Sequence, residues 1–135
     1  MIDLHTHTLL SDGQLIPSEH IRRAECTGYR TIGISDHADM ATMGKIIPVL
    51  LEAARVENEL GRIRVIVGIE LTHVRPVHIA QAAEMARKLG ASYVIVHGQT
   101  IIEPVEDGTN LAAIEAGVRQ GWDAVIGKDG AFVGM

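Results

Sequence analysis

Short runs of β-branched residues alternate with helical patterns along this chain, and this alternation limits the fold more than any other feature. The clearest run is Arg64–Leu71, which carries Val65, Ile66, Val67 and Ile69. Runs without polar alternation are typical of parallel strands covered on both faces. The strand–helix pattern repeats about every thirty residues, as right-handed βαβ crossovers require. The sequence therefore predicts an α/β fold with a parallel sheet.

Proline and glycine residues set the expected boundaries of these elements. Pro17 suits the first turn of a helix, and Gly28 suits the position just after its end. Gly61 and Gly90 end the next two helices in the same way, and Asn110 is expected to cap a fourth. The expected strands are residues 1–4, 31–35, 64–71, 93–96 and 122–126, and the expected helices are residues 17–27, 46–60, 76–89 and 110–118.

The apolar stripes of two of these helices indicate which face each should bury. Residues three and four apart lie on one face of a helix. The second helix, which we expect to begin at Ile46 or Pro48, carries one such stripe, and the third helix carries another. The expected buried stripes are Val49, Ala53, Val56 and Leu60 in the second helix, and Ile79, Ala83, Ala86 and Leu89 in the third.

Composition narrows the class of protein. The 135 residues suffice for one domain with a real core. The chain has 12 Lys and Arg against 17 Asp and Glu and a formal charge of −5. This acidic balance argues against nucleic-acid or membrane-surface partners. Cys26 is the sole cysteine, which excludes a disulfide framework. Without a leader pattern or a long apolar run, we expect a cytoplasmic location.

Polar side chains stand at the end of each of the first four expected strands. Histidines two residues apart on a strand point to the same face. In parallel α/β folds the carboxyl ends of the strands share one edge, where functional sites are built. We therefore expect these side chains to meet at a common rim. They are His5 and His7, Asp36 and His37, Glu70, and His97, with Asp12 in the loop after the first strand.

Each of these residues also has an ordinary structural explanation. Asp12 before Gly13 is common in turns, and Asp36 can cap a helix or orient a neighbouring group. A lone histidine at a strand end, such as His97, usually belongs to the polar rim. Four equivalent strand ends with matching chemistry are harder to explain in this way. We interpret them as one site, in which the catalytic residues are His5, His7, Glu70 and His97.

Three further histidines fall outside this pattern. His20 and His78 lie on the expected outer helices and should face solvent. His73 follows Glu70 by three residues, so it either belongs to an exposed loop or contacts substrate near the rim.

The ligand types at the rim predict a metal cluster. Imidazole and carboxylate groups without thiolates suit zinc, manganese or iron. Six candidate ligands exceed the need of one ion, so two or three ions are expected, with a bridging hydroxide as the nucleophile toward phosphate. The candidate ligands are His5, His7, Asp12, His37, Glu70 and His97. The chain contains no serine-nucleophile, Walker or dinucleotide-binding motif that would compete with this interpretation.

The four rim motifs together resemble the PHP (polymerase and histidinol phosphatase) superfamily over residues 1–117. They are the segments 3–8 with 11–13, 35–37, 68–70 and 96–98. The resemblance implies a distorted seven-stranded β/α barrel, up to three divalent metals and hydrolysis of phosphate esters. It also implies that His5, His7 and Glu70 hold the first metal, that Glu70 and His97 share the second, and that the third is held by Asp12 and His37.

The chain departs from the family pattern over residues 118–135. The resemblance implies one more ligand for each metal from later strands, but no histidine follows His97. We therefore expect a single incomplete PHP domain over residues 1–135, with about five of seven βα units and one well-occupied metal position. An open last strand edge would favour pairing with a second copy of the chain. Phe132 and Val133 would help to cover that side.

The expected function is that of a metal-dependent phosphoesterase, similar to histidinol phosphatase, that acts on a small phosphorylated substrate. Arg75 and Lys128 are candidates for holding the substrate phosphate, and Asp129 is a candidate for a missing metal ligand. One alternative is a truncated fragment or pseudo-enzyme that binds metal weakly and has little activity. Another is a non-enzymatic module that supports a polymerase, which the acidic charge disfavours.

Overall fold

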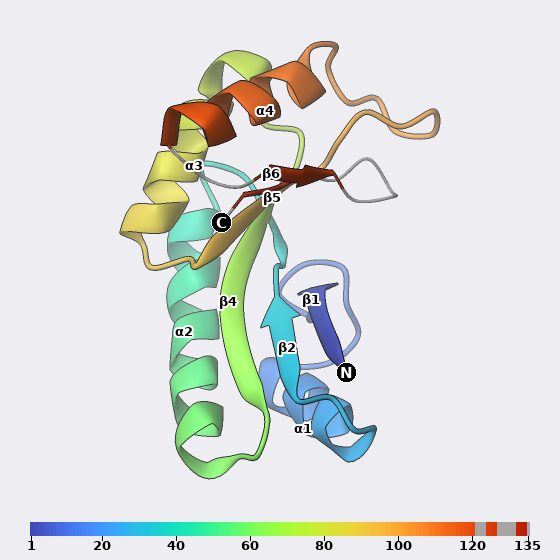
Figure 1. Cartoon of the computed structure of the whole chain (residues 1–135), viewed down its shortest axis with the longest axis vertical. Helices are drawn as coiled ribbons and strands as arrows, with labels where there is room; N and C mark the ends of the chain where they lie inside the picture. The colour runs from blue at the N-terminus through green and yellow to red at the C-terminus, as the bar shows by residue number, and fades with distance from the viewer. Residues whose placement is uncertain (121–123, 127–131, 135) are drawn as a thin grey trace.

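The computed structural model describes residues 1–120, 124–126 and 132–134 and shows a strongly curled sheet with helices packed against it (Figure 1). β1, β2, β4 and β5 are parallel neighbours in that order, and the short β3 pairs with β4. This half-barrel arrangement confirms the expected partial β/α barrel. The elements are β1 (Ile2–Thr6), α1 (Pro17–Cys26), β2 (Thr31–Ile34), β3 (His37–Ala38), α2 (Met43–Leu60), β4 (Arg64–Leu71), η1 (Pro76–His78), α3 (Ile79–Lys88), β5 (Tyr93–Val96), α4 (Thr109–Gln120), β6 (Ala124–Ile126) and β7 (Phe132–Gly134).

The end of the sheet differs from the expectation. β6 lies within the expected strand 122–126, but it does not pair with β5. Instead β7 lies between them and pairs antiparallel with both, with Val96 opposite Phe132. β6 and β7 are close in sequence, and strands joined by a short connection pair antiparallel, whereas a parallel pair needs a long crossover. The edge of β5 is therefore covered by the chain itself, and β1 and β6 end the described sheet.

The core lies between the sheet and its helices. α2 runs alongside β4 (Figure 1). Alternate residues of β4 face the helices, where Val67 joins Leu50 in one apolar cluster and Ile69 joins Ile47 in another. The other face of β4 turns toward the concave side of the sheet, where Ile66 packs against Tyr93. Glu70 belongs to this concave face, since side chains alternate along a strand. No helix in the described part of the chain is long and apolar enough to span a membrane.

The expected buried face of α2 is wrong. The helix begins at Met43, with Pro48 inside it, and its buried residues are Met43, Ile47, Leu50 and Ala54. Val49 is 49% exposed and Leu60 is 83% exposed. Residues 46–51 are all apolar, so periodicity alone could not select a face there. In α3, by contrast, the buried residues include Ile79, Ala83 and Ala86, as expected.

The expected cap of the fourth helix is also wrong. α4 already begins at Thr109, so Asn110 lies inside its first turn. The side-chain oxygen of Asn110 instead accepts a hydrogen bond of 2.9 Å from the backbone N–H of Gln99. Asn110 therefore ties the start of α4 to the loop after β5.

Gly33 and Gly68 lie directly against the side chain of Tyr93. A Cβ on Gly68 would overlap the ring, and a Cβ on Gly33 would overlap its hydroxyl group. Tyr93 is 1% exposed, so the ring has little room to move. We expect Gly68→Ala to lower the free energy of unfolding by about 2 kcal/mol, because the added methyl group overpacks the core. Urea denaturation measures this change.

The Tyr93→Leu background provides the control, because a smaller side chain leaves space for the added methyl group. There Gly68→Ala should cost less than about 0.5 kcal/mol, and the difference between backgrounds gives the coupling. An equal cost in both backgrounds would mean that the ring does not require glycine at this position.

Candidate metal centre

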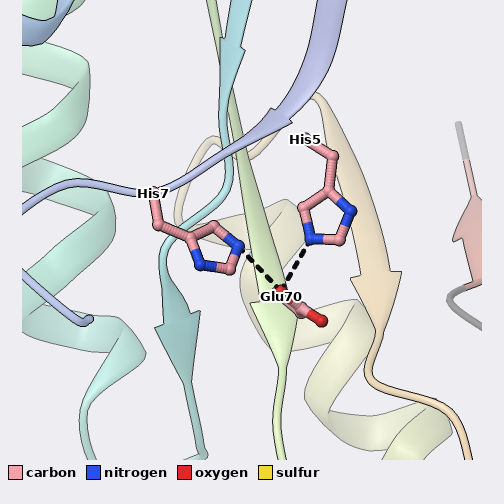
Figure 2. Close-up of side chains that lie close together, drawn as sticks. All are labelled: His5, His7 and Glu70. Carbon is pink, nitrogen blue, oxygen red and sulfur yellow. Dashed lines mark hydrogen bonds and ion pairs between the residues drawn. The ribbon is translucent and has the colours of Figure 1, made fainter. Parts of the chain in front are cut away.

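Four histidines from three segments of the chain surround one carboxylate at the rim of the sheet. β1 carries His5, and His7 follows its last residue, so the two rings reach Glu70 from the same side (Figure 2). His37 begins β3 and stands opposite Glu70 in the β3–β4 pair. His97 directly follows β5. The parallel strands thus bring together residues that lie up to 92 positions apart in the chain.

Glu70 is the centre of this arrangement. Its side chain is almost fully buried, with the residue 1% exposed. One carboxylate oxygen, Oε1, lies 3.0 Å from a ring nitrogen of His97. The other, Oε2, lies 2.8 Å from Nε2 of His5, 2.9 Å from Nε2 of His7 and 3.4 Å from Nδ1 of His37.

The protonation of Glu70 follows from these contacts. Burial by itself raises the pKa of the carboxyl group, because it penalises the charged form. The hydrogen bond from His5, the close contact of His7 and the nearby charge of His37 outweigh burial, and they hold the pKa of Glu70 well below its usual range. The group is therefore an ionised carboxylate at neutral pH, as a metal ligand must be.

Asp12 brings a second carboxylate to the solvent side of the site. Its Oδ1 atom lies 2.7 Å from Nδ1 of His7, and its Oδ2 atom lies 3.3 Å from Nε2 of His37. Slight burial by itself raises the pKa of Asp12. The hydrogen bond from His7 and the charge of His37 have a larger, opposite effect, so the pKa of Asp12 lies below its usual value. Burial lowers the pKa of His7, yet its contacts with Glu70 and Asp12 produce a net increase.

Buried hydroxyl and carboxylate groups hold the ligands in place. Asp36 is fully buried and accepts hydrogen bonds from the backbone N–H and the hydroxyl of Thr8, each 2.7 Å, and from the hydroxyl of Ser11 at 2.6 Å. These bonds fix the loop that carries Asp12. Thr72 lies 2.5 Å from Nδ1 of His37 and orients that ring. Sequence reasoning proposed an orienting role for Asp36 but missed Thr72.

The donor atoms fit a divalent cation. The Nε2 atoms of His7 and His97 are buried, yet neither makes an aligned hydrogen bond. Each nevertheless lies within 3 Å of a carboxylate oxygen, at 2.9 Å and 2.8 Å respectively. Nitrogen and oxygen atoms that are close without pointing at each other are typical of ligands directed at a common ion. Buried imidazole nitrogens without partners would otherwise be costly.

The described residues form three overlapping ligand groups, in each of which the donor atoms lie within 4.8 Å of one another. The first group has the same members as the set that the resemblance implies for the first metal, and that role stays a prediction. The other two gain a member each, because His7 joins the pair Asp12 and His37, and His37 joins the pair Glu70 and His97. The groups are His5, His7 and Glu70; His7, Asp12 and His37; and His37, Glu70 and His97.

The remaining predicted residues lie apart from this cluster or outside the described chain. Arg75 is exposed and pairs with Glu106 at 2.6 Å. Lys128 and Asp129 fall outside the described residues. His78 is exposed, as expected.

The expectation that His20 faces solvent is wrong. Its ring is half-buried, and its Nε2 atom lies 2.9 Å from the hydroxyl of Thr6, which itself donates to the carbonyl of Gly33. Burial lowers the pKa of His20. The residue therefore connects α1 to the first two strands instead of facing solvent.

Glu103 is a neighbour of the cluster that sequence reasoning missed. It lies in the loop between β5 and α4, and its Oε2 atom is 2.8 Å from Nε2 of His97 and 3.6 Å from Nε2 of His73. The available signal was an acidic residue six positions after His97, in a loop at the carboxyl end of a strand. Such loops commonly carry functional residues.

Comparisons with known proteins agree with this geometry. The chain is 46% identical over 112 residues to an uncharacterized protein of Methanocaldococcus jannaschii, an alignment that covers 82% of this chain and 51% of that protein. The chain thus spans about half the length of this curated relative. No solved structure matches. The family model for the PHP domain matches residues 3–127, a range that includes every rim residue from His5 to His97. The chain therefore belongs to the PHP domain family.

Proposed function

We propose that this protein is a metal-dependent phosphoesterase that hydrolyses phosphate monoesters, in the manner of histidinol phosphatase. The observation that carries the proposal is the buried Glu70 carboxylate, with four imidazole rings within 3.4 Å of its oxygens. Membership of a family that includes metal-dependent hydrolases supports it. The imidazole and carboxylate donors favour zinc, manganese or iron.

The residues have distinct proposed roles. His5, His7 and Glu70 would hold one ion, and Asp12 and His37 would hold another on the exposed side of the cluster. When bound, such ions supply an activated water and positive charge beside the phosphate oxygens. Glu70 remains ionised, so it can hold the histidine nitrogens and the ions together. Asp36 keeps the Asp12 loop in position.

Arg75 is a candidate for binding the phosphate, because its guanidinium group is exposed at the carboxyl end of the sheet, four residues after β4. Its partner Glu106 would have to release it when substrate binds. Arginine suits this role because its planar guanidinium group binds phosphate oxygens in pairs.

Hydrolysis of p-nitrophenyl phosphate with added Mn²⁺ tests the proposal. We expect turnover by the wild type and loss of at least about a hundredfold in His7→Ala, because His7 belongs to two ligand groups and orienting partners alone commonly contribute 10–100-fold. His78→Ala, which changes an exposed histidine away from the rim, should retain full activity. Activity that survives His7→Ala would point to a contaminating phosphatase.

A second candidate is a PHP fragment that binds metal weakly and catalyses little. The shared ligands favour it, since His7, His37 and Glu70 each belong to two of the three groups. The three groups together contain only six residues, so three ions cannot each have a separate set of three ligands. Bound metal without turnover of p-nitrophenyl phosphate or histidinol phosphate would support this candidate over the enzyme.

A further inference from the structure

β1 contains a bulge in the segment that carries the first two candidate ligands. Between Asp3 and Thr6, β1 has one residue more than the segment of β2 with which it pairs. A bulge of this kind bends one strand and re-aims its side chains, and bulges are common beside active sites. His5 lies inside the bulged segment, and His7 directly follows it. The direction of both imidazole rings therefore depends on how the bulge is held.

The strand opposite the bulge carries Gly33, which lets the two backbones come close together. A Cβ atom at this position would lie 2.8 Å from Cα of Leu4, which is closer than packed side chains come. Glycine inside a strand often marks a bulge or a close backbone approach. On β1 itself, the Oδ1 atom of Asp3 accepts a hydrogen bond of 3.0 Å from the backbone N–H of His5. The sequences of both strands thus fit the bulge.

Thr6 holds the end of the bulge with both its backbone and its side chain. Its carbonyl accepts a hydrogen bond of 2.8 Å from the N–H of Ser35, and its hydroxyl donates one of 2.7 Å to the carbonyl of Gly33. Nε2 of His20 lies 2.9 Å from the same hydroxyl oxygen. Because a hydroxyl has one hydrogen, which is already donated, the ring of His20 must be the donor in this contact. His20 therefore links α1 to the bulged end of β1.

We propose that His20 is a positioning residue for the metal centre. By donating to Thr6, it holds the bulged end of β1 and keeps both imidazoles of that segment directed at Glu70 (Figure 2). A shift of the bulge would turn both rings at once, because they share one strand end, whereas the ligands on other strands would stay in place. This inference rests on the proposed function in one respect, since it takes the rim to bind metal ions.

Binding of Co²⁺ to the metal-free full chain tests the inference without relying on activity. The dissociation constant measures the affinity, and the visible absorption of the bound ion reports its coordination. His20→Leu removes the donor but keeps an apolar side chain in the half-buried position. We expect it to bind the tightest Co²⁺ about tenfold more weakly and to change the absorption bands. His20→Gln should stay within about threefold of the wild type, because its amide nitrogen can donate in place of Nε2.

Thr6→Val provides a second variant, because it removes the acceptor of the same hydrogen bond. It should weaken Co²⁺ binding at least as much as His20→Leu does, and His20→Leu should cause no further loss in the Thr6→Val background. Ile21→Val is the matched control, since it deletes one buried methyl group from the neighbouring position of α1 and leaves the hydrogen bond intact. It should lower stability without changing the affinity for Co²⁺ or the absorption bands.

The outcomes separate this inference from the proposed function. A wild-type chain that binds no Co²⁺ would contradict both. Unchanged affinity and absorption in His20→Leu, with the ion bound by the wild type, would overturn this inference alone. An equal loss of affinity in His20→Gln would also overturn it, because the shape of the ring and not its hydrogen bond would then be what α1 supplies.

Discussion

Replacement of Glu70 by glutamine is expected to weaken binding of the tightest Mn²⁺ or Zn²⁺ ion by at least about a hundredfold. Glu70 is the carboxylate that contacts His5, His7 and His97 within 3.0 Å, and it belongs to two of the three ligand groups. Glutamine has nearly the same shape but carries no charge and offers one oxygen instead of two. Even residues that only orient metal ligands contribute 10–100-fold to affinity. Equilibrium dialysis with metal analysis measures this change.

Glu84→Gln is the matched control for this experiment. Glu84 is exposed on α3 and pairs with Lys88, a surface pair that contributes little. The control should bind metal as the wild type does. Tight binding that is unchanged in Glu70→Gln would show that the ions do not require the buried carboxylate.

The same variant should change how the stability of the metal-free protein depends on pH. The pKa of Glu70 is lowered on folding, so its charge stabilises the native state above the unfolded pKa, and this contribution is lost as pH falls toward the folded value. The pKa of His7 is raised on folding, so its contribution is present below about pH 6.5 and is lost as pH rises through the folded value. Glu70→Gln should remove the loss of stability that Glu70 causes as pH falls. It should also weaken the loss of stability that His7 causes as pH rises.

The strands that form the rim could be predicted closely from the sequence. β4 and β5 have the expected bounds, because each is a continuous apolar run between turn residues or charged ends. Their parallel order follows from the strand–helix alternation, and this order placed Glu70 beside the histidines. Residues far apart in the chain could therefore be assigned to one site before any distance was known.

Other features depended on contacts that a single sequence does not encode locally. The insertion of β7 between β5 and β6 is a long-range pairing without a local pattern. The buried face of α2 was ambiguous because its middle is apolar on all sides. Glu103 was missed because its role depends on the path of a loop, which brings it to His97. Loop paths are set by tertiary packing and are less predictable than periodic elements.

The support of the Asp12 loop gives the largest expected effect on stability. Asp36 is fully buried beside Thr8, which is also fully buried, and it accepts three hydrogen bonds of 2.6–2.7 Å from Thr8 and Ser11. Removal of this acceptor leaves buried donors without partners, and each such group costs about 1–3 kcal/mol. We expect Asp36→Ala to lower the free energy of unfolding by about 3 kcal/mol, measured by urea denaturation of metal-free protein.

Two companion variants define what Asp36 does. Ser11→Ala removes one of the three bonds and should cost about 1 kcal/mol, and its effect should vanish in the Asp36→Ala background, where the bond is already absent. Asp36→Asn retains one oxygen and should be intermediate. Because Asp36 holds the loop that positions Asp12, metal affinity should fall in the same order as stability across these variants. An Asp36→Ala protein within about 0.5 kcal/mol of the wild type would show that water replaces the carboxylate and that the loop does not need it.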